Sequence, residues 1–403
     1  MKKPSLLIIF LSVFIDLIGF GIVLPLLPLY SKQFGAGGAI IGVIIASFSL
    51  MQFLFAPAWG RLSDRIGRRP VILISNAGST ISYALFAVAS TLTGPSGLWL
   101  LLVSRIFAGI CGANLSVANA YIADISSPEK RTQRMGLIGM AFGLGFVFGP
   151  ALGSFSFHQF GLPGPGWTAA SLCAMNFLLG CFVLGESWKP NSEHVQKRPK
   201  LAQWMQTLQR PTVGFVIGTY FLATFCFACF ESTFSLLVKE QFRFDERHTG
   251  YLFTYCGLFG AFLQAGVVGW LNRRFGEQRL IAGSLIAVAV SLAVLPVVSH
   301  LTGVLLTLGL FAAGSGINRP PTFGLISLRT PPEEQGATLG VAQSAASLAR
   351  IFGPIFANTL YALKPSLPYL ACAGIALFAG LWAWNYLCRP DPELMNADVQ
   401  NAG

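Results

Sequence analysis

Long apolar stretches, separated by short polar connections, dominate the chain from end to end. About a dozen of them approach 20 residues, the length of helix that crosses a hydrocarbon core of about 30 Å. Lipid offers no hydrogen-bond partner to the backbone, so each stretch must satisfy its polar groups internally, as a helix. We therefore expect an all-α polytopic membrane protein. The expected spans are residues 5–29, 39–60, 70–91, 98–125, 135–157, 167–187, 212–238, 249–271, 279–299, 301–328, 336–361 and 367–387.

Charged residues are scarce and unevenly placed. They make up 11% of the chain, against about 25% in a typical soluble domain. The net charge of +11 would suggest a nucleic-acid partner in a soluble protein, but here nineteen of the 27 lysines and arginines fall in the two terminal segments and in alternate connections. The other connections hold only Lys32, Lys239, Arg243, Arg247 and Lys364.

This asymmetry predicts an orientation, because loops rich in lysine and arginine stay on the cytoplasmic side during insertion. We expect a multi-pass protein of a bacterial-type inner (plasma) membrane with both termini in the cytoplasm. Its surroundings would be the lipid bilayer. We expect a monomer and no nucleic-acid partner.

The sequence repeats itself in two halves. At an offset of 204 residues the identical pairs are Gly112 and Gly316, Asn114 and Asn318, Pro128 and Pro332, Glu129 and Glu333, Gly136 and Gly340, Phe148 and Phe352, Gly149 and Gly353, and Pro150 and Pro354. At an offset of 209 they are Gly60 and Gly269, Leu62 and Leu271, Arg65 and Arg274, and Gly67 and Gly276. We expect six-helix bundles at 1–188 and 212–388, a cytoplasmic linker at 189–211 and a cytoplasmic tail at 389–403. Many secondary transporters are built from two such repeats, with the substrate site at the interface between them.

One connection carries a specific motif, Gly-Arg-Leu-Ser-Asp-Arg-Ile-Gly-Arg-Arg at residues 60–69. It matches the signature loop between helices 2 and 3 of the major facilitator superfamily, and over nearly its whole length the chain resembles the drug/proton antiporter branch of that family, close to the tetracycline-resistance exporters. The resemblance implies the major facilitator fold, with 12 transmembrane helices in two six-helix bundles. It also implies a latch in which the acid faces the start of helix 11 near Gly336 and the arginines pair with the acid ending helix 4. The latch residues are Gly60, Asp64, Arg65, Gly67, Arg68 and Asp124. Plain anchoring by positive charge is the alternative.

The fifth expected span carries glycines at intervals and one proline, namely Gly136, Gly145, Gly149, Pro150 and Gly153. In the related family this pattern accompanies antiport rather than symport. Glycines at such spacing let helices approach closely, and a proline removes a backbone bond and can bend a helix. A purely packing role is the alternative, and a proton-coupled symporter for uptake of a small organic solute is the alternative function.

Four charged residues well inside spans are the candidates for proton coupling: Asp16, Arg105, Glu231 and Arg350. A carboxylate at bilayer depth costs about 2.5–3.5 kcal/mol on insertion scales, so it usually faces a cavity and has a partner. We place Asp16 about 16 Å and Arg105 about 20 Å from the inner face, and we expect them to pair. The resemblance ties the arginine to proton coupling, while a static ion pair is the alternative. A second, weaker pair is Glu231 with Arg350, whose expected heights differ by about 7 Å.

The resemblance also suggests which residues line the substrate cavity. At three other positions this chain lacks the polar residues of the tetracycline exporters. The cavity candidates are Phe14, Phe20, Asn114, Asn119, Phe227, Tyr255, Gln264 and Asn318. The polar residues of the tetracycline exporters in helices 3, 8 and 9 align with Ser82, Gly260 and Ala287, so we do not expect tetracycline as the substrate. We expect no enzyme activity, no metal and no cofactor beyond a proton gradient. The predicted function is proton-coupled export of small amphipathic organic compounds.

Overall fold

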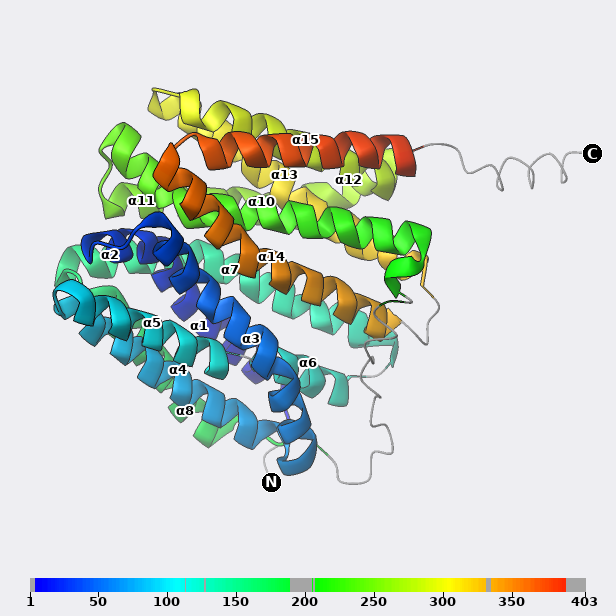
Figure 1. Cartoon of the computed structure of the whole chain (residues 1–403). Helices are drawn as coiled ribbons and strands as arrows, with labels where there is room; N and C mark the ends of the chain where they lie inside the picture. Colours follow the sequence, from blue (N-terminus) through cyan, green and yellow to red (C-terminus); the bar gives the residue numbers. More distant parts are fainter. Residues whose placement is uncertain are drawn as a thin grey trace, which may run out of the picture.

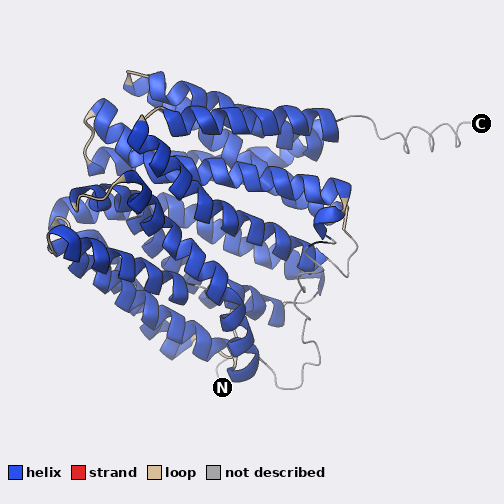
Figure 2. Ribbon diagram, viewed as in Figure 1, coloured by secondary structure: helices blue, strands red, loops and turns tan. Residues whose placement is uncertain are grey.

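The computed structural model describes residues 4–112, 114–126, 128–188, 205, 207–330 and 335–388, and this part of the chain is almost wholly helical (Figure 2). The first bundle contains α1 (Leu6–Val23), η1 (Leu24–Leu26), α2 (Leu27–Gln33), α3 (Gly38–Ile66), α4 (Arg68–Thr91), α5 (Gly94–Cys111), α6 (Asn114–Asp124), α7 (Pro128–Phe160) and α8 (Gly164–Val183). The second contains α10 (Pro211–Phe242), α11 (Glu246–Phe262), η2 (Leu263–Val267), α12 (Val268–Val294), η3 (Leu295–Val297), α13 (Leu301–Leu328), α14 (Gln335–Leu363) and α15 (Leu367–Leu387).

These helices account for the twelve expected spans. Eleven helical segments of the described chain are long and apolar enough to cross a membrane. The remaining span consists of α11, the π-helical turn η2 and the first part of α12, which bends at Gly276. The expected fold class, two six-helix bundles of an all-α membrane protein, is confirmed. The expected linker, 189–211, and the tail, 389–403, lie largely outside the described residues, so the exact boundaries of the halves stay a prediction.

The two bundles touch at one end of the molecule, the end that carries α2 (Figure 1). There α3 lies against α14: a Cβ added at Gly42 would be 2.6 Å from the Ile355 Cα, and one added at Gly38 would strike the Asn358 carbonyl. Glu240 of α10 forms an ion pair with Lys32 of α2 across this contact and accepts a 2.9 Å hydrogen bond from the Tyr361 hydroxyl of its own bundle. Toward the opposite end, where α3 and α15 finish, the helices of the two bundles diverge (Figure 1). We call these the α2 end and the termini end.

Candidate functional site

A buried arginine in α5 is the centre of the candidate site. Arg105 has no solvent exposure. Its guanidinium lies over three rings, at 5.7 Å from the Phe48 centroid, 5.6 Å from that of Tyr83 and 5.9 Å from that of Phe86. The guanidinium approaches the Tyr83 hydroxyl, but none of its three nitrogens makes a hydrogen bond of normal geometry to a described residue. Aromatic faces attract the charge, yet its hydrogen-bonding capacity is left unused.

Arg105 faces a small cavity between the bundles. Its volume is about 20 Å³, which is enough for about one water molecule. The lining residues are Phe20, Leu24, Leu27, Ile45, Phe48, Ser49 and Arg105 of the first bundle and Ala228, Glu231, Arg350 and Pro354 of the second. Glu231 interacts electrostatically with Arg350 without forming an ion pair, and its buried Oε1 has no hydrogen-bond partner among the described residues. Three ionisable groups from two bundles therefore share one cavity wall.

The predicted ion pair between Asp16 and Arg105 is not present, and in that respect the expectation was wrong. Asp16 is half-buried in α1 beside the Ser79 hydroxyl. Tyr83 interacts electrostatically with both charged groups, and its ring packs 3.1 Å from where a Cβ on Gly19 would stand, one turn along α1 from Asp16. Equal depth in the membrane thus did not bring the two side chains together, because a tyrosine from α4 occupies the space beside α1. The roles of both residues in proton coupling stay predictions.

An aromatic series connects two of the predicted cavity residues across the molecule. Phe20 lies 5.0 Å from Phe48 and 6.1 Å from Phe146 between ring centroids. Phe146 is 6.3 Å from Phe227, which stacks on Phe311 at 5.9 Å. This series passes from α3 through α1, α7 and α10 to α13 and offers apolar and π-electron contacts beside the charged cavity.

Two other predicted cavity residues face the interior of the second bundle. Asn318 is buried and donates a 2.8 Å hydrogen bond to the Ser284 hydroxyl, which joins α13 to α12. The Tyr255 hydroxyl lies 2.8 Å from where a Cβ on Gly309 would stand. Asn318 is thus engaged in packing, and neither residue lines the charged cavity.

The remaining predicted cavity residues are dispersed. Phe14 stacks on Phe10 at 6.1 Å and meets Phe148 edge-on. Gln264 is exposed in η2, and Asn119 is partly buried in α6. The side chain of Asn114 lies outside the described part of the structure. None of the three described residues lines the cavity around Arg105.

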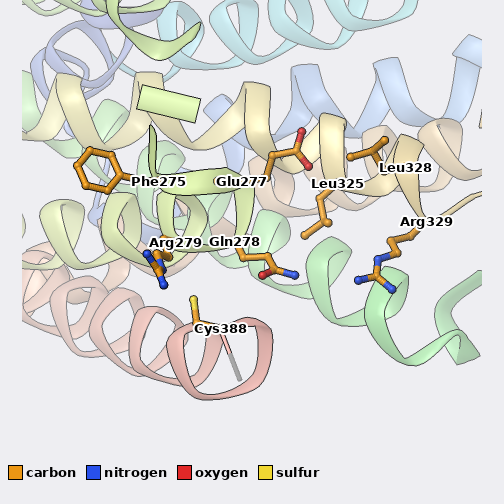
Figure 3. A pocket seen from close by; sticks show the side chains of 9 residues that line it. Phe275, Glu277, Gln278, Arg279, Leu325, Leu328, Arg329 and Cys388 are labelled. Atoms are coloured by element: carbon orange, nitrogen blue, oxygen red, sulfur yellow. The ribbon is translucent and has the colours of Figure 1, made fainter. Parts of the chain in front are cut away.

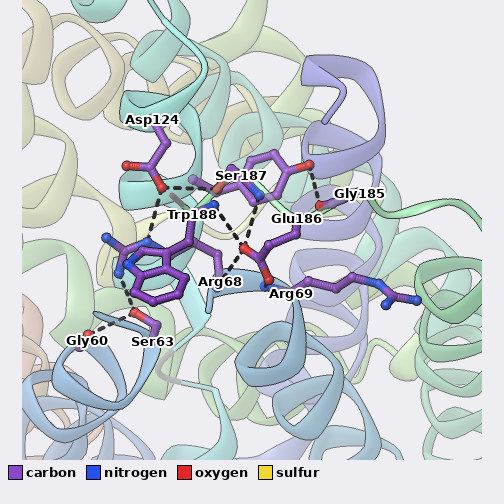
Figure 4. A network of polar contacts seen from close by, with 10 residues as sticks. Gly60, Ser63, Arg68, Arg69, Asp124, Gly185, Glu186, Ser187 and Trp188 are labelled. Atoms are coloured by element: carbon purple, nitrogen blue, oxygen red, sulfur yellow. Dashed lines mark hydrogen bonds and ion pairs between the residues drawn. The ribbon is translucent and has the colours of Figure 1, made fainter. Parts of the chain in front are cut away.

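The predicted latch motif forms a polar network at the termini end (Figure 4). The backbone turns at Gly67 with a φ of 101°, a left-handed conformation that favours glycine. The expected contact between an arginine and the acid ending helix 4 is present: Arg68 Nε lies 3.2 Å from an Asp124 oxygen. Arg68 also donates a 2.6 Å bond to Ser63. Arg65 is exposed, and Gly60 is buried and supplies the carbonyl that accepts from Ser63.

Glu186, just beyond α8, is a network residue that the sequence reasoning missed. Its carboxylate accepts hydrogen bonds from the backbone N–H groups of Arg68 and Arg69, the first two residues of α4, at 2.9 and 3.1 Å. A lone acid at the inner end of the predicted span 167–187, on the same side of the membrane as the four arginines of 61–69, was the available signal. The side chain of Asp64 and the surroundings of Gly336 lie outside the described part of the structure, so the latch role stays a prediction.

The glycines of the fifth span pack against α1. A Cβ added at Gly145 would lie 2.9 Å from Leu17, one at Gly149 would lie 2.6 Å from Gly21, and one at Gly153 would lie 2.7 Å from the Ile22 carbonyl. The two backbones are therefore in close contact over about two turns of α7. Pro150 lies inside α7. The surroundings of Gly136 are outside the described part. Close packing is thus a physical role of this pattern, and transport direction stays a prediction.

This contact gives a stability prediction. Gly149→Ala would force a methyl group against the backbone of Gly21, which cannot move aside, so we expect a loss of about 1–3 kcal/mol in folding free energy. Gly143→Ala on the same helix is the matched control, because no described atom lies within 4 Å of its added Cβ. The folding free energy of the Gly143→Ala variant should equal that of the wild type or be up to about 1 kcal/mol more favourable. Thermal unfolding of both variants in detergent measures this, and equal melting temperatures would contradict the packing role.

Two six-helix bundles with ionisable groups at the contact between them define a secondary membrane transporter rather than an enzyme. The described residues contain no group of three His, Cys, Asp or Glu side chains that could hold a metal.

Comparison with known proteins identifies the family. The model of the Major Facilitator Superfamily matches residues 9–354 and 216–401. The tetracycline resistance protein, class C, of Escherichia coli is 33% identical over 376 residues, which cover 91% of this chain and 92% of that protein. Multidrug resistance protein 2 of Bacillus subtilis is 27% identical over 387 residues, 94% of each chain. The solved human organic anion transporter MFSD10 (TETRAN) has a TM-score of 0.70 at 25% identity and covers 94% of this chain and 100% of its own. The chain belongs to the major facilitator superfamily, and it resembles the drug/proton antiporter branch.

Proposed function

We propose that this protein exports small amphipathic organic compounds in exchange for protons, by alternating access between the two bundles. The observation that carries the proposal is the cavity shared by Arg105, Glu231 and Arg350, which joins charges of both bundles at their contact. A change of protonation within a span changes the charge that the opposite bundle meets, so it can bias which bundle arrangement is favoured.

In this proposal Asp16 and Glu231 are the proton-binding groups. Both carboxyl groups lie inside spans, where an uncompensated charge is costly. Arg105 and Arg350 respond to the proton through the cavity wall. The aromatic series from Phe48 to Phe311 supplies a surface that accepts many apolar shapes. The names of two relatives, a tetracycline resistance protein and a multidrug resistance protein, support a toxic organic compound as cargo. The protein would act as a monomer in a bacterial-type inner membrane, with its termini in the cytoplasm. It would need no cofactor, and a proton gradient would drive transport.

Reconstitution in liposomes tests the proposal. The probes are ethidium, a permanent cation, and carboxyfluorescein, an organic anion, since one solved relative is an organic anion transporter. With an acidic lumen, we expect one probe to accumulate inside against its gradient as protons leave, and a protonophore should abolish this accumulation. Protein-free liposomes are the control. Accumulation in the same direction as the protons would contradict antiport and establish the symport alternative.

A further inference from the structure

A buried tyrosine of α4 lies beside both charged residues of the first bundle. The edge of the Tyr83 ring packs against α1: Cε2 and Cζ, the carbon that carries the hydroxyl, are 3.1 and 3.4 Å from where a Cβ on Gly19 would stand. Gly19 and Asp16 are three residues apart, so they lie on the same face of α1. The missing side chain at Gly19 thus lets the hydroxyl end of Tyr83 reach the helical turn that carries Asp16.

Tyr83 also meets Arg105 of α5. The guanidinium carbon is 5.6 Å from the centroid of the Tyr83 ring, and the guanidinium approaches the hydroxyl. Arg105 has no solvent exposure, and its three nitrogens make no hydrogen bond of normal geometry to a described residue. The guanidinium is therefore held by the rings around it and by the Tyr83 hydroxyl, rather than by an ion pair with a described acid.

One face of α4 connects the two charged residues. Ser79 and Tyr83 are four residues apart, so their side chains are neighbours on the same face of the helix. The Ser79 hydroxyl lies beside Asp16, and Tyr83 interacts electrostatically with Asp16 and with Arg105. A change at Asp16 can therefore reach Arg105 along this face without direct contact between the two.

The other titratable groups that interact with Asp16 are thiols. They belong to Cys111 in α5 and Cys173 in α8, and a thiol is largely neutral near pH 7. α7 packs against the same part of α1 through Gly145, which meets Leu17. The polar groups that respond to the charge of Asp16 are thus mainly those of α4.

The chemistry of a tyrosine hydroxyl suits a connecting role, because the group can donate one hydrogen bond and accept others. When Asp16 is ionised, its carboxylate attracts the hydroxyl hydrogen, while the hydroxyl oxygen attracts the guanidinium. A proton on Asp16 weakens the first attraction, and it weakens the second as well, because linked polar groups polarise one another. We propose that Tyr83 is a positioning residue that transmits the protonation state of Asp16 to Arg105. This inference rests on the proposed function, in which Asp16 binds the transported proton.

A shift of Arg105 reaches the second bundle through the small cavity that both bundles line, where Glu231 and Arg350 stand. A larger cavity of about 430 Å³ opens at the termini end of α12, α13 and α15 (Figure 3). Its lining contains neither Asp16 nor Arg105, and neither Glu231 nor Arg350. The small cavity is thus the place where the proposed signal passes from one bundle to the other.

Tyr83→Phe tests the proposal, because phenylalanine keeps the ring against Gly19 and beside the guanidinium and removes only the hydroxyl. Wild type and variant are compared in proteoliposomes, with whichever of ethidium and carboxyfluorescein the wild type accumulates. We expect accumulation driven by the proton gradient to fall about tenfold, while exchange of internal for external probe without a gradient continues. The exchange rate, which should depend on pH in the wild type, should become nearly independent of pH in the variant. A purely structural role would lower the melting temperature and leave the shape of the pH profile unchanged.

Two further variants control this test. Tyr369→Phe removes the hydroxyl of another buried tyrosine, which lies 3.1 Å from the Thr233 hydroxyl and does not line the cavity of Arg105. It should accumulate the probe like the wild type. In Asp16→Asn there is no change of protonation to transmit, so adding Tyr83→Phe should alter its exchange rate by less than about twofold.

The proposal is overturned if Tyr83→Phe accumulates the probe to within about twofold of the wild type. It is also overturned if Tyr83→Phe lowers the exchange rate of Asp16→Asn about tenfold, because the two residues would then act independently. Wild-type protein that accumulates neither probe would overturn the proposed function, and this inference with it. The two failures are therefore distinguishable.

Discussion

Arg105→Met should abolish transport of the probes while leaving the protein folded. The guanidinium is the one charge that the first bundle contributes to the shared cavity, and none of its nitrogens has a normal hydrogen bond to a described residue. In the proposed mechanism this charge acts on the second bundle during the transport step, and losing such an interaction costs roughly 2–5 kcal/mol, a fall of at least about 30-fold in rate. Methionine fills much of the same volume among the rings of Phe48, Tyr83 and Phe86.

The Arg105→Met variant should lose transport activity without losing stability. A buried cation without a full set of partners is costly, and replacing such a group by an apolar side chain is often neutral or stabilising. We therefore expect an unchanged or higher melting temperature for Arg105→Met. Arg105→Lys, which keeps the charge but loses the planar group that lies over three rings, should retain partial activity. Transport by Arg105→Met within twofold of the wild type would refute a functional role for this residue.

Asp16→Asn should uncouple transport from the proton gradient. Asparagine has nearly the shape of aspartate and can still reach the Ser79 hydroxyl, but it cannot take up or release a proton. We expect energised accumulation of the probe to disappear, while exchange of internal for external probe without a gradient continues. Both rates are measured in the same proteoliposomes.

Two further variants make the result interpretable. Asp245→Asn removes an exposed acid that caps α11 and does not line the cavity of Arg105, and it should remain coupled. Asp16→Glu keeps a titratable group at the same position and should retain coupling in part. If Asp16→Asn still accumulates probe against a gradient, Asp16 does not carry the proton, and Glu231→Gln becomes the decisive variant.

The architecture was predictable from the sequence because it follows from local properties. Apolar length predicts each span, and the internal repeat predicted that Gly67 and Gly276 occupy equivalent turns, which the shared left-handed backbone bears out. The contact between Arg68 and Asp124 also came from the motif. The spans and the turns follow from a few residues or from the repeat, whereas the pairing of Arg68 with Asp124 was implied by the resemblance of the motif to a known family.

The arrangement of the intramembrane charges was predictable only in part. Depth along a helix gives the height of a side chain in the membrane but not the direction in which it points. Asp16 and Arg105 share a height, but Tyr83 lies beside both. Glu231 and Arg350 differ in expected height, but their helices are neighbours and both side chains reach one cavity. Rotation about the helix axis is set by tertiary packing, which no single span encodes.

At the α2 end, glycines let the helices of the two bundles approach closely. Gly38 and Gly42 place α3 directly on α14, and Gly250 and Gly257 place α11 equally close to α7. Such a seal has few side chains that could rotate aside one at a time. It can separate only when each bundle tilts as a rigid body, and a partial opening would break many contacts for little gain. We therefore expect a transporter built this way to leak few ions between transport cycles, because no single side-chain rotation opens a passage through this contact.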